Sequence, residues 1–80
     1  SIFRKAIASV SLATDRKEEA RIRNNFGIAL SDANQFKQAL AQHRKAFLLS
    51  QNFKNEEQRT IAALQIKLCE HCINYGPDSN

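Results

Sequence analysis

The sequence predicts an all-α protein built from antiparallel helical hairpins, and three observations support this fold class. Apolar residues recur at helical spacing along the chain of 80 residues, and strand-like alternation is not sustained. The composition includes only 2 Gly and 1 Pro, whereas an all-β sandwich or barrel needs far more turn residues. Short polar stretches separate the apolar ones, and short connections favour antiparallel packing of neighbouring helices. We therefore expect four helices in a single domain.

The first two expected helices are marked by apolar stripes and by a capping signal. Phe3 and Ile7 lie on one face of a helix over residues 1–13. Asp15 is the expected N-cap of the second helix, and Glu18 lies three residues later, where a capping box places an acidic side chain. The expected packing stripe of the second helix consists of Ile22, Phe26, Ala29, Leu30 and Ala33.

The last two expected helices follow turns that contain asparagine. Asn34 can adopt the left-handed backbone conformation that helix C-termini favour. Asn55 is the expected cap of the fourth helix, with Gln58 in the capping-box position, and this helix covers about residues 56–75. Gly76, which precedes a proline, ends it as a C-cap glycine. The expected packing face of the third helix consists of Phe36, Ala39, Leu40, His43, Ala46, Phe47 and Leu49.

A pattern of small residues spans the second and third helices: Phe26-Gly27-x-x-Leu30, then Ala39, then Ala46. This spacing resembles the tetratricopeptide repeat (TPR) family, in which the glycine and the two alanines lie where helices cross closely. Three positions depart from the family pattern: Arg23, His43 and Gln51.

The resemblance implies how the chain divides. One repeat covers residues 20–51, residues 1–13 correspond to the second helix of a preceding repeat, and residues 56–76 correspond to the first helix of a following one. The implied fold is a TPR-like α-solenoid segment of four helices within a longer array. The spacing between Phe26 and its counterpart Leu68 is similar to the extended-helix repeats of kinesin light chain and of a cell-polarity adaptor family. A closed four-helix bundle is the alternative architecture.

The resemblance also implies a function: a non-catalytic scaffold that binds a peptide or helix of a partner protein in a groove. In the family, an asparagine at the position of Asn25 commonly contacts the ligand backbone. The residue types agree, because amides can hydrogen-bond an extended peptide, Ile28 can contact an apolar side chain and Arg21 can pair with an acidic one. The expected partner contacts are Arg21, Asn24, Asn25, Ile28 and Lys67.

The last helix is apolar over a wide arc, which supports an alternative function. A helix covered on one side needs an apolar stripe of only about 100°. The wider arc indicates a further neighbour, either another repeat or another subunit. Self-association through this helix, giving a homo-oligomer, is therefore the alternative. The arc consists of Ile61, Leu64, Leu68 and Cys72 on one side and Ala62, Ile66, Cys69 and Ile73 on the other.

The charge of the chain narrows the class of partner. Its formal net charge is +4, which favours an acidic protein or peptide. Nucleic acid is not the expected partner, because the basic residues near the second helix are spread around it and no aromatic residues lie between them. These basic residues are Arg16, Lys17, Arg21 and Arg23.

Catalysis, metals and membranes are not indicated. Cys69 and Cys72 flank His71, but one such pair supplies too few ligands for structural zinc, so neither metal nor cofactor is expected. His43 is expected to be a half-buried packing residue, and no phosphate loop or activated nucleophile indicates an enzyme. No apolar run approaches the roughly 18 residues of a membrane span. Two cysteines do not form a disulfide framework, which favours a reducing, cytoplasmic location.

Overall fold

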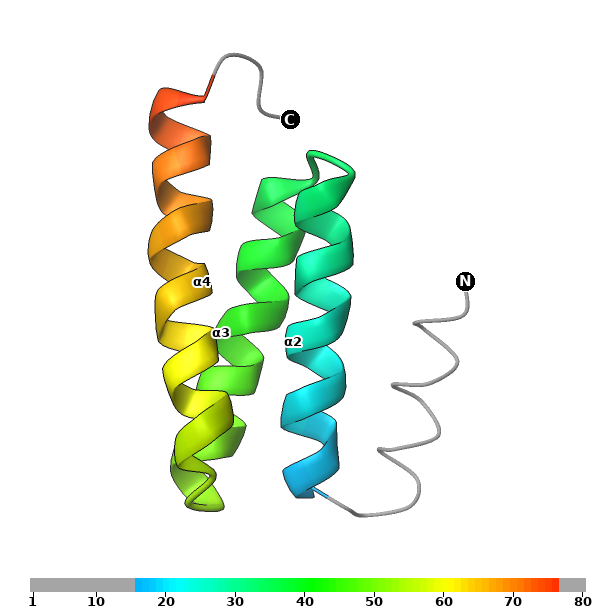
Figure 1. Cartoon of the computed structure of the whole chain (residues 1–80), viewed down its shortest axis with the longest axis vertical. Coiled ribbons are helices and arrows are strands. Elements are labelled where there is room, and N and C mark those ends of the chain that lie inside the picture. Colours follow the sequence, from blue (N-terminus) through cyan, green and yellow to red (C-terminus); the bar gives the residue numbers. More distant parts are fainter. Residues whose placement is uncertain (1–15, 77–80) are drawn as a thin grey trace.

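The computed structural model describes residues 16–76, and this part of the chain forms three helices and no strand (Figure 1). Helix α2 covers Arg16–Asp32, α3 covers Phe36–Asn52 and α4 covers Glu56–Tyr75. The prediction of an all-α fold is therefore confirmed for these residues. The helix expected over residues 1–13 and the Asp15 cap lie outside the described residues, so three of the four expected helices are seen.

The helices run antiparallel in chain order, as the short connections predicted. Figure 1 shows α3 between α2 and α4, and α4 extends beyond the turn that joins α2 to α3. Both outer helices pack against α3, and α2 and α4 also contact each other. A side of α2 and a side of α4 consequently face away from α3.

The two turns share one backbone design. In the first, Asn34 has a φ of 62°, and the backbone N–H of Gln35 donates to the carbonyl of Leu30 at 2.8 Å. In the second, Lys54 has a φ of 56°, and the N–H of Asn55 donates to the carbonyl of Ser50 at 2.8 Å. These bonds satisfy carbonyls that a helix end would otherwise leave unpaired. The left-handed conformation of Asn34 was predicted, whereas that of Lys54 was not.

The ends of α4 agree only partly with prediction. Asn55 caps the helix, since its side-chain oxygen accepts a hydrogen bond from the backbone N–H of Gln58 at 3.3 Å. Gly76 occupies the C-cap, but its φ of −70° and ψ of 153° are extended and not left-handed. The cause is the following residue, Pro77, because a residue that precedes proline is restricted to extended conformations.

Alanines occupy the centre of the core. Four of them have no exposed surface, and such small side chains allow neighbouring helices to approach closely. Ala39 and Ala46, the alanines of the TPR-like pattern, are among them. The fully buried alanines are Ala20, Ala39, Ala46 and Ala62.

The packing face of α2 differs from the predicted stripe. Ile22, Phe26 and Leu30 are only partly buried, and Ala33 is exposed. The buried centre of α2 consists of Glu19, Ala20, Asn24 and Gly27. The helix is thus rotated relative to the prediction, with polar and small residues facing α3 and α4.

Candidate functional site

A buried chain of hydrogen bonds joins the three helices. Asn24 of α2 donates through its side-chain nitrogen to two oxygens of Gln58 on α4, the backbone carbonyl at 3.1 Å and Oε1 at 2.9 Å. Its side-chain oxygen lies 2.8 Å from Nδ1 of His43 on α3. Because a backbone carbonyl can only accept, the amide orientation of Asn24 is fixed, and Nδ1 of His43 must donate. All three side chains are buried.

The imidazole of His43 fills the space above Gly27. A Cβ atom added to Gly27 would lie 2.4 Å from Nε2 of His43 and 2.6 Å from Cε1. The glycine is therefore small because the ring lies against it, and not because a neighbouring backbone approaches, as the resemblance implied. His43 is also fully buried, although the sequence predicted half-burial.

The second ring nitrogen of His43 has no hydrogen-bond partner. Nε2 is buried without one, and as the acceptor nitrogen of a neutral ring it is easier to leave unpaired than a charged N–H. Burial lowers the pKa of His43 below its ordinary value, because the charged imidazolium is disfavoured away from water. Protonation would add a donor that faces Gly27 and has nothing to bind.

A second polar cluster links α2 to α3. Arg23 donates through Nε to Glu19 at 2.8 Å and through Nη1 to the side-chain oxygen of Gln42 at 2.9 Å. The side chain of Arg23 is only 14% exposed and that of Glu19 only 4%. Arg23, one of the three departures from the TPR-like pattern, is therefore held in the packed structure by Glu19 and Gln42.

Three of the predicted contact residues share one exposed stripe of α2. Arg21, Asn25 and Ile28 are spaced by four and three residues, and all three are exposed. Asp32 continues this stripe. Arg21 is already paired, because it donates through Nε to Glu18 at 2.9 Å, and this hydrogen bond raises the pKa of Arg21.

The structure separates the other two predicted contacts from this stripe. Asn24 was expected to lie away from the packing face, but it is buried by its bonds to His43 and Gln58 and has no surface for a partner. Lys67 is exposed on α4. It lies one turn after Leu64 and one turn before Glu70, which pairs with Arg44 of α3 at 3.4 Å, so Lys67 lies between these two residues on the outer side of α4.

The predicted partner contact on α4 was Lys67, but the most prominent exposed feature of this helix is an apolar row. Leu64 is 57% exposed, Leu68 is 50% exposed and Tyr75 is 77% exposed. Their spacing places them on one side of the helix, next to the half-buried Ile61 and Cys72. Four of these residues belong to the apolar arc that the sequence indicated, and Tyr75 extends it.

The α2 stripe and the α4 row border the same side of the molecule, which we call the α2–α4 face. It comprises Arg21, Asn25, Ile28 and Asp32 of α2 and Ile61, Leu64, Leu68, Cys72 and Tyr75 of α4. The helices touch beneath it, where Oγ of Ser31 lies 3.5 Å from Sγ of Cys69. A hollow of about 300 Å³ opens there, lined by Ser31, Asp32, Phe36, Gln65, Leu68, Cys69 and Cys72.

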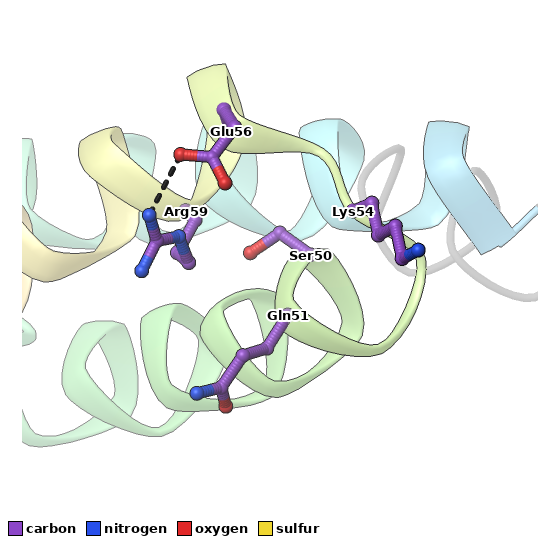
Figure 2. A pocket seen from close by; sticks show the side chains of 5 residues that line it. All are labelled: Ser50, Gln51, Lys54, Glu56 and Arg59. Carbon is purple, nitrogen blue, oxygen red and sulfur yellow. Dashed lines mark hydrogen bonds and ion pairs between the residues drawn. The ribbon is translucent and has the colours of Figure 1, made fainter.

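A smaller hollow of about 180 Å³ lies at the turn between α3 and α4 (Figure 2). Arg59 pairs with Glu56 at 2.7 Å, and Ser50 donates to the carbonyl of Phe47 at 3.0 Å. Gln51 and Lys54 complete the lining. Because Arg59 and Glu56 are paired with each other and no apolar side chain of the described residues lines this hollow, it offers less to an apolar partner segment than the α2–α4 face.

Comparison of the chain with protein-family models, with characterised proteins and with solved structures finds no match in any of the three. Within residues 16–76, no three side chains of His, Cys, Asp or Glu are grouped as a metal would require. None of the three described helices has the length and apolar character to cross a membrane.

The contact between Gly27 and His43 predicts that Gly27→Ala destabilises the protein when His43 is present and stabilises it when His43 is replaced. Gly27→Ala should lower the free energy of unfolding by about 2 kcal/mol, because the added methyl group overlaps the imidazole. In a His43→Ala background the same change should raise it by about 1 kcal/mol through helix propensity. Urea unfolding of the four proteins measures both effects, and an equal loss in both backgrounds would contradict the contact.

The neighbouring asparagines provide a matched pair. Asn24→Ala should lower the free energy of unfolding by about 3 kcal/mol, because it leaves buried polar atoms of His43 and Gln58 unpaired. Asn25→Ala should change stability by less than about 0.5 kcal/mol, because Asn25 is exposed. Thermal unfolding followed by circular dichroism compares them, and similar melting temperatures would show that the buried network is absent.

The lowered pKa of His43 predicts a pH dependence of stability. The unfolded chain binds a proton at the ordinary histidine pKa of about 6.5, whereas the folded protein binds it only at lower pH. The free energy of unfolding should therefore fall as the pH decreases below about 6.5 and continue to fall down to the folded-state pKa. Urea unfolding between pH 7.5 and 5.5 tests this, with exposed His71→Gln as the control that keeps the effect and His43→Gln as the variant that loses it.

Proposed function

We propose that this chain is a non-catalytic protein-interaction module that binds a segment of a partner protein on the α2–α4 face. The observation that carries the proposal is the exposed row of Leu64, Leu68 and Tyr75 on α4. Single exposed apolar residues are common, but a contiguous row beside a hollow is typical of interaction sites. Burying the row in a complex would remove this apolar surface from water.

The α2 side of the face supplies the polar contacts that such a complex needs. The amide of Asn25 can donate to and accept from a peptide backbone, and Ile28 adds apolar area next to it. From Ile61 to Tyr75 the α4 row extends over about 20 Å, given the rise of about 1.5 Å per residue. This length suits three to four turns of an amphipathic helix.

The proposed architecture is TPR-like, with α2 and α3 as one hairpin and α4 as the first helix of the next. The short antiparallel connections and the buried alanines at Ala39 and Ala46 support it. We also propose a reducing, cytoplasmic setting, because Cys69 and Cys72 are free thiols. Catalysis by His43 is disfavoured, since the ring is buried and no substrate could reach it.

Self-association is the second candidate function, and the same α4 row favours it. Two copies of α4 packed antiparallel would bury Leu64 and Leu68 of both chains in one symmetric interface. Sedimentation of the chain at increasing concentration distinguishes the two: a monomer over the whole range excludes self-association, and a dimer abolished by Leu64→Glu would establish it.

Substitutions of two leucines with similar exposure, Leu64 and Leu48, test the proposed site. Random 16-residue peptides displayed on phage are selected on the wild-type chain, and their affinities are measured by fluorescence polarisation. Leu64→Glu should weaken the binding of the selected peptides about tenfold or more, because it places a charge in the centre of the site. Asn25→Ala should also weaken peptide binding, without lowering the melting temperature of the protein.

Leu48→Glu is the matched control, because Leu48 is 60% exposed, much as Leu64 is, but lies on the outer side of α3. It should leave the affinities unchanged. Failure to select any binding peptide, or equal losses in Leu64→Glu and Leu48→Glu, would contradict the proposed function.

A further inference from the structure

The α2–α4 face carries acidic side chains although the chain as a whole is basic. Asp32 and Glu57 are exposed, and neither forms an ion pair with another described residue. Glu57 lies four residues before Ile61 and so belongs to the end of the α4 row. Arg21, the basic side chain described on the α2 stripe, is paired with Glu18. The unpaired charges at Asp32 and Glu57 are therefore negative, although the net charge of the chain is +4.

Among the residues whose side chains the structure describes, the basic side chains that form no ion pair are Lys37 and Lys45 of α3, Lys54 of the following turn and Lys67 of α4. Lys37 and Lys45 are exposed on α3, away from the buried Ala39 and Ala46. Lys67 is exposed on α4, one turn after Leu64. None of these four lysines lines the hollow beside Asp32.

The hollow next to Asp32 combines an apolar wall with a negative rim. Phe36, Leu68 and Cys72 supply the wall, and Asp32 lies at its edge. Asp32 is the last residue of α2, where the helix dipole is already negative, and α2 has no basic residue in its last turn to compensate. A cation is therefore favoured at this edge for two reasons that act together.

We infer that the partner segment is a basic amphipathic helix that places a lysine or arginine side chain in the hollow beside Asp32. This inference rests on the proposed function, since it specifies the ligand of the same face. The methylene groups of the inserted side chain pack against Phe36 and Leu68, and its charged head pairs with the Asp32 carboxylate. This proposal replaces the expectation of an acidic partner, which was drawn from the net charge.

The experiment uses the peptides selected on the wild-type chain. Their sequences should be enriched in lysine or arginine, and their affinity should fall as the salt concentration rises. Asp32→Asn should weaken binding about fivefold, which is the size expected for a partly exposed charge pair. Replacing the critical lysine or arginine of the peptide by glutamine should weaken binding to the wild-type chain but have little further effect on Asp32→Asn.

Glu56→Gln is the control variant, because Glu56 is engaged with Arg59 at the opposite end of α4. It should leave the affinities unchanged. Selected peptides that depend on Leu64 but are acidic, or that bind Asp32→Asn as tightly as the wild type, would overturn this inference and leave the proposed function intact. Absence of any Leu64-dependent peptide would instead overturn the proposed function itself.

Discussion

The hydrogen bonds that Asn24 makes to His43 and Gln58 are the constraint on which the rest of the structure depends. They connect the three described helices at one buried point, and each lost bond would leave a polar group without water or partner. Apolar contacts tolerate sliding, whereas a buried amide accepts few geometries. The network therefore sets the rotation of α2 about its axis as well as its distance from α3 and α4.

That rotation decides which residues are left for a partner. With Asn24 and Gly27 turned inward, the stripe of Arg21, Asn25 and Ile28 is turned outward. The core between the helices is filled by alanines and polar side chains, so it has no room for Leu64 or Leu68. The exposed apolar row on α4 is thus a consequence of how the polar network and the alanines pack the three helices.

Local signals in the sequence were sufficient to predict the described helices and their turns. They were not sufficient to predict which face of each helix is buried. Asn34 and Asn55 identified a turn and a cap because each acts on backbone groups within a few residues. Asn24 and Asn25 look alike in the sequence, and only the positions of His43 and Gln58, which are distant along the chain, decide which is buried. A search for apolar periodicity overlooks a packing face built from an amide, a glycine and an alanine.

The conformation of Lys54 and the surroundings of Lys67 were also not predicted, because the residue type alone does not reveal the contacts on which they depend. The left-handed conformation of Lys54 follows from the hydrogen bond between Asn55 and Ser50, which closes the turn whatever the residue type. The position of Lys67 depends on how α4 packs against α3, a contact between helices. The wide apolar arc of α4 was visible in the sequence, because exposed and buried leucines contribute equally to a pattern.

The tautomer of His43 tests the central network most directly. Long-range ¹H–¹⁵N correlation spectra distinguish the two ring nitrogens of each histidine at neutral pH. The network requires the proton of neutral His43 to reside on Nδ1, where it is donated to Asn24, with Nε2 unprotonated against Gly27. A His43 ring with its proton on Nε2, or one that exchanges rapidly between both forms as a solvent-exposed histidine does, would contradict the account.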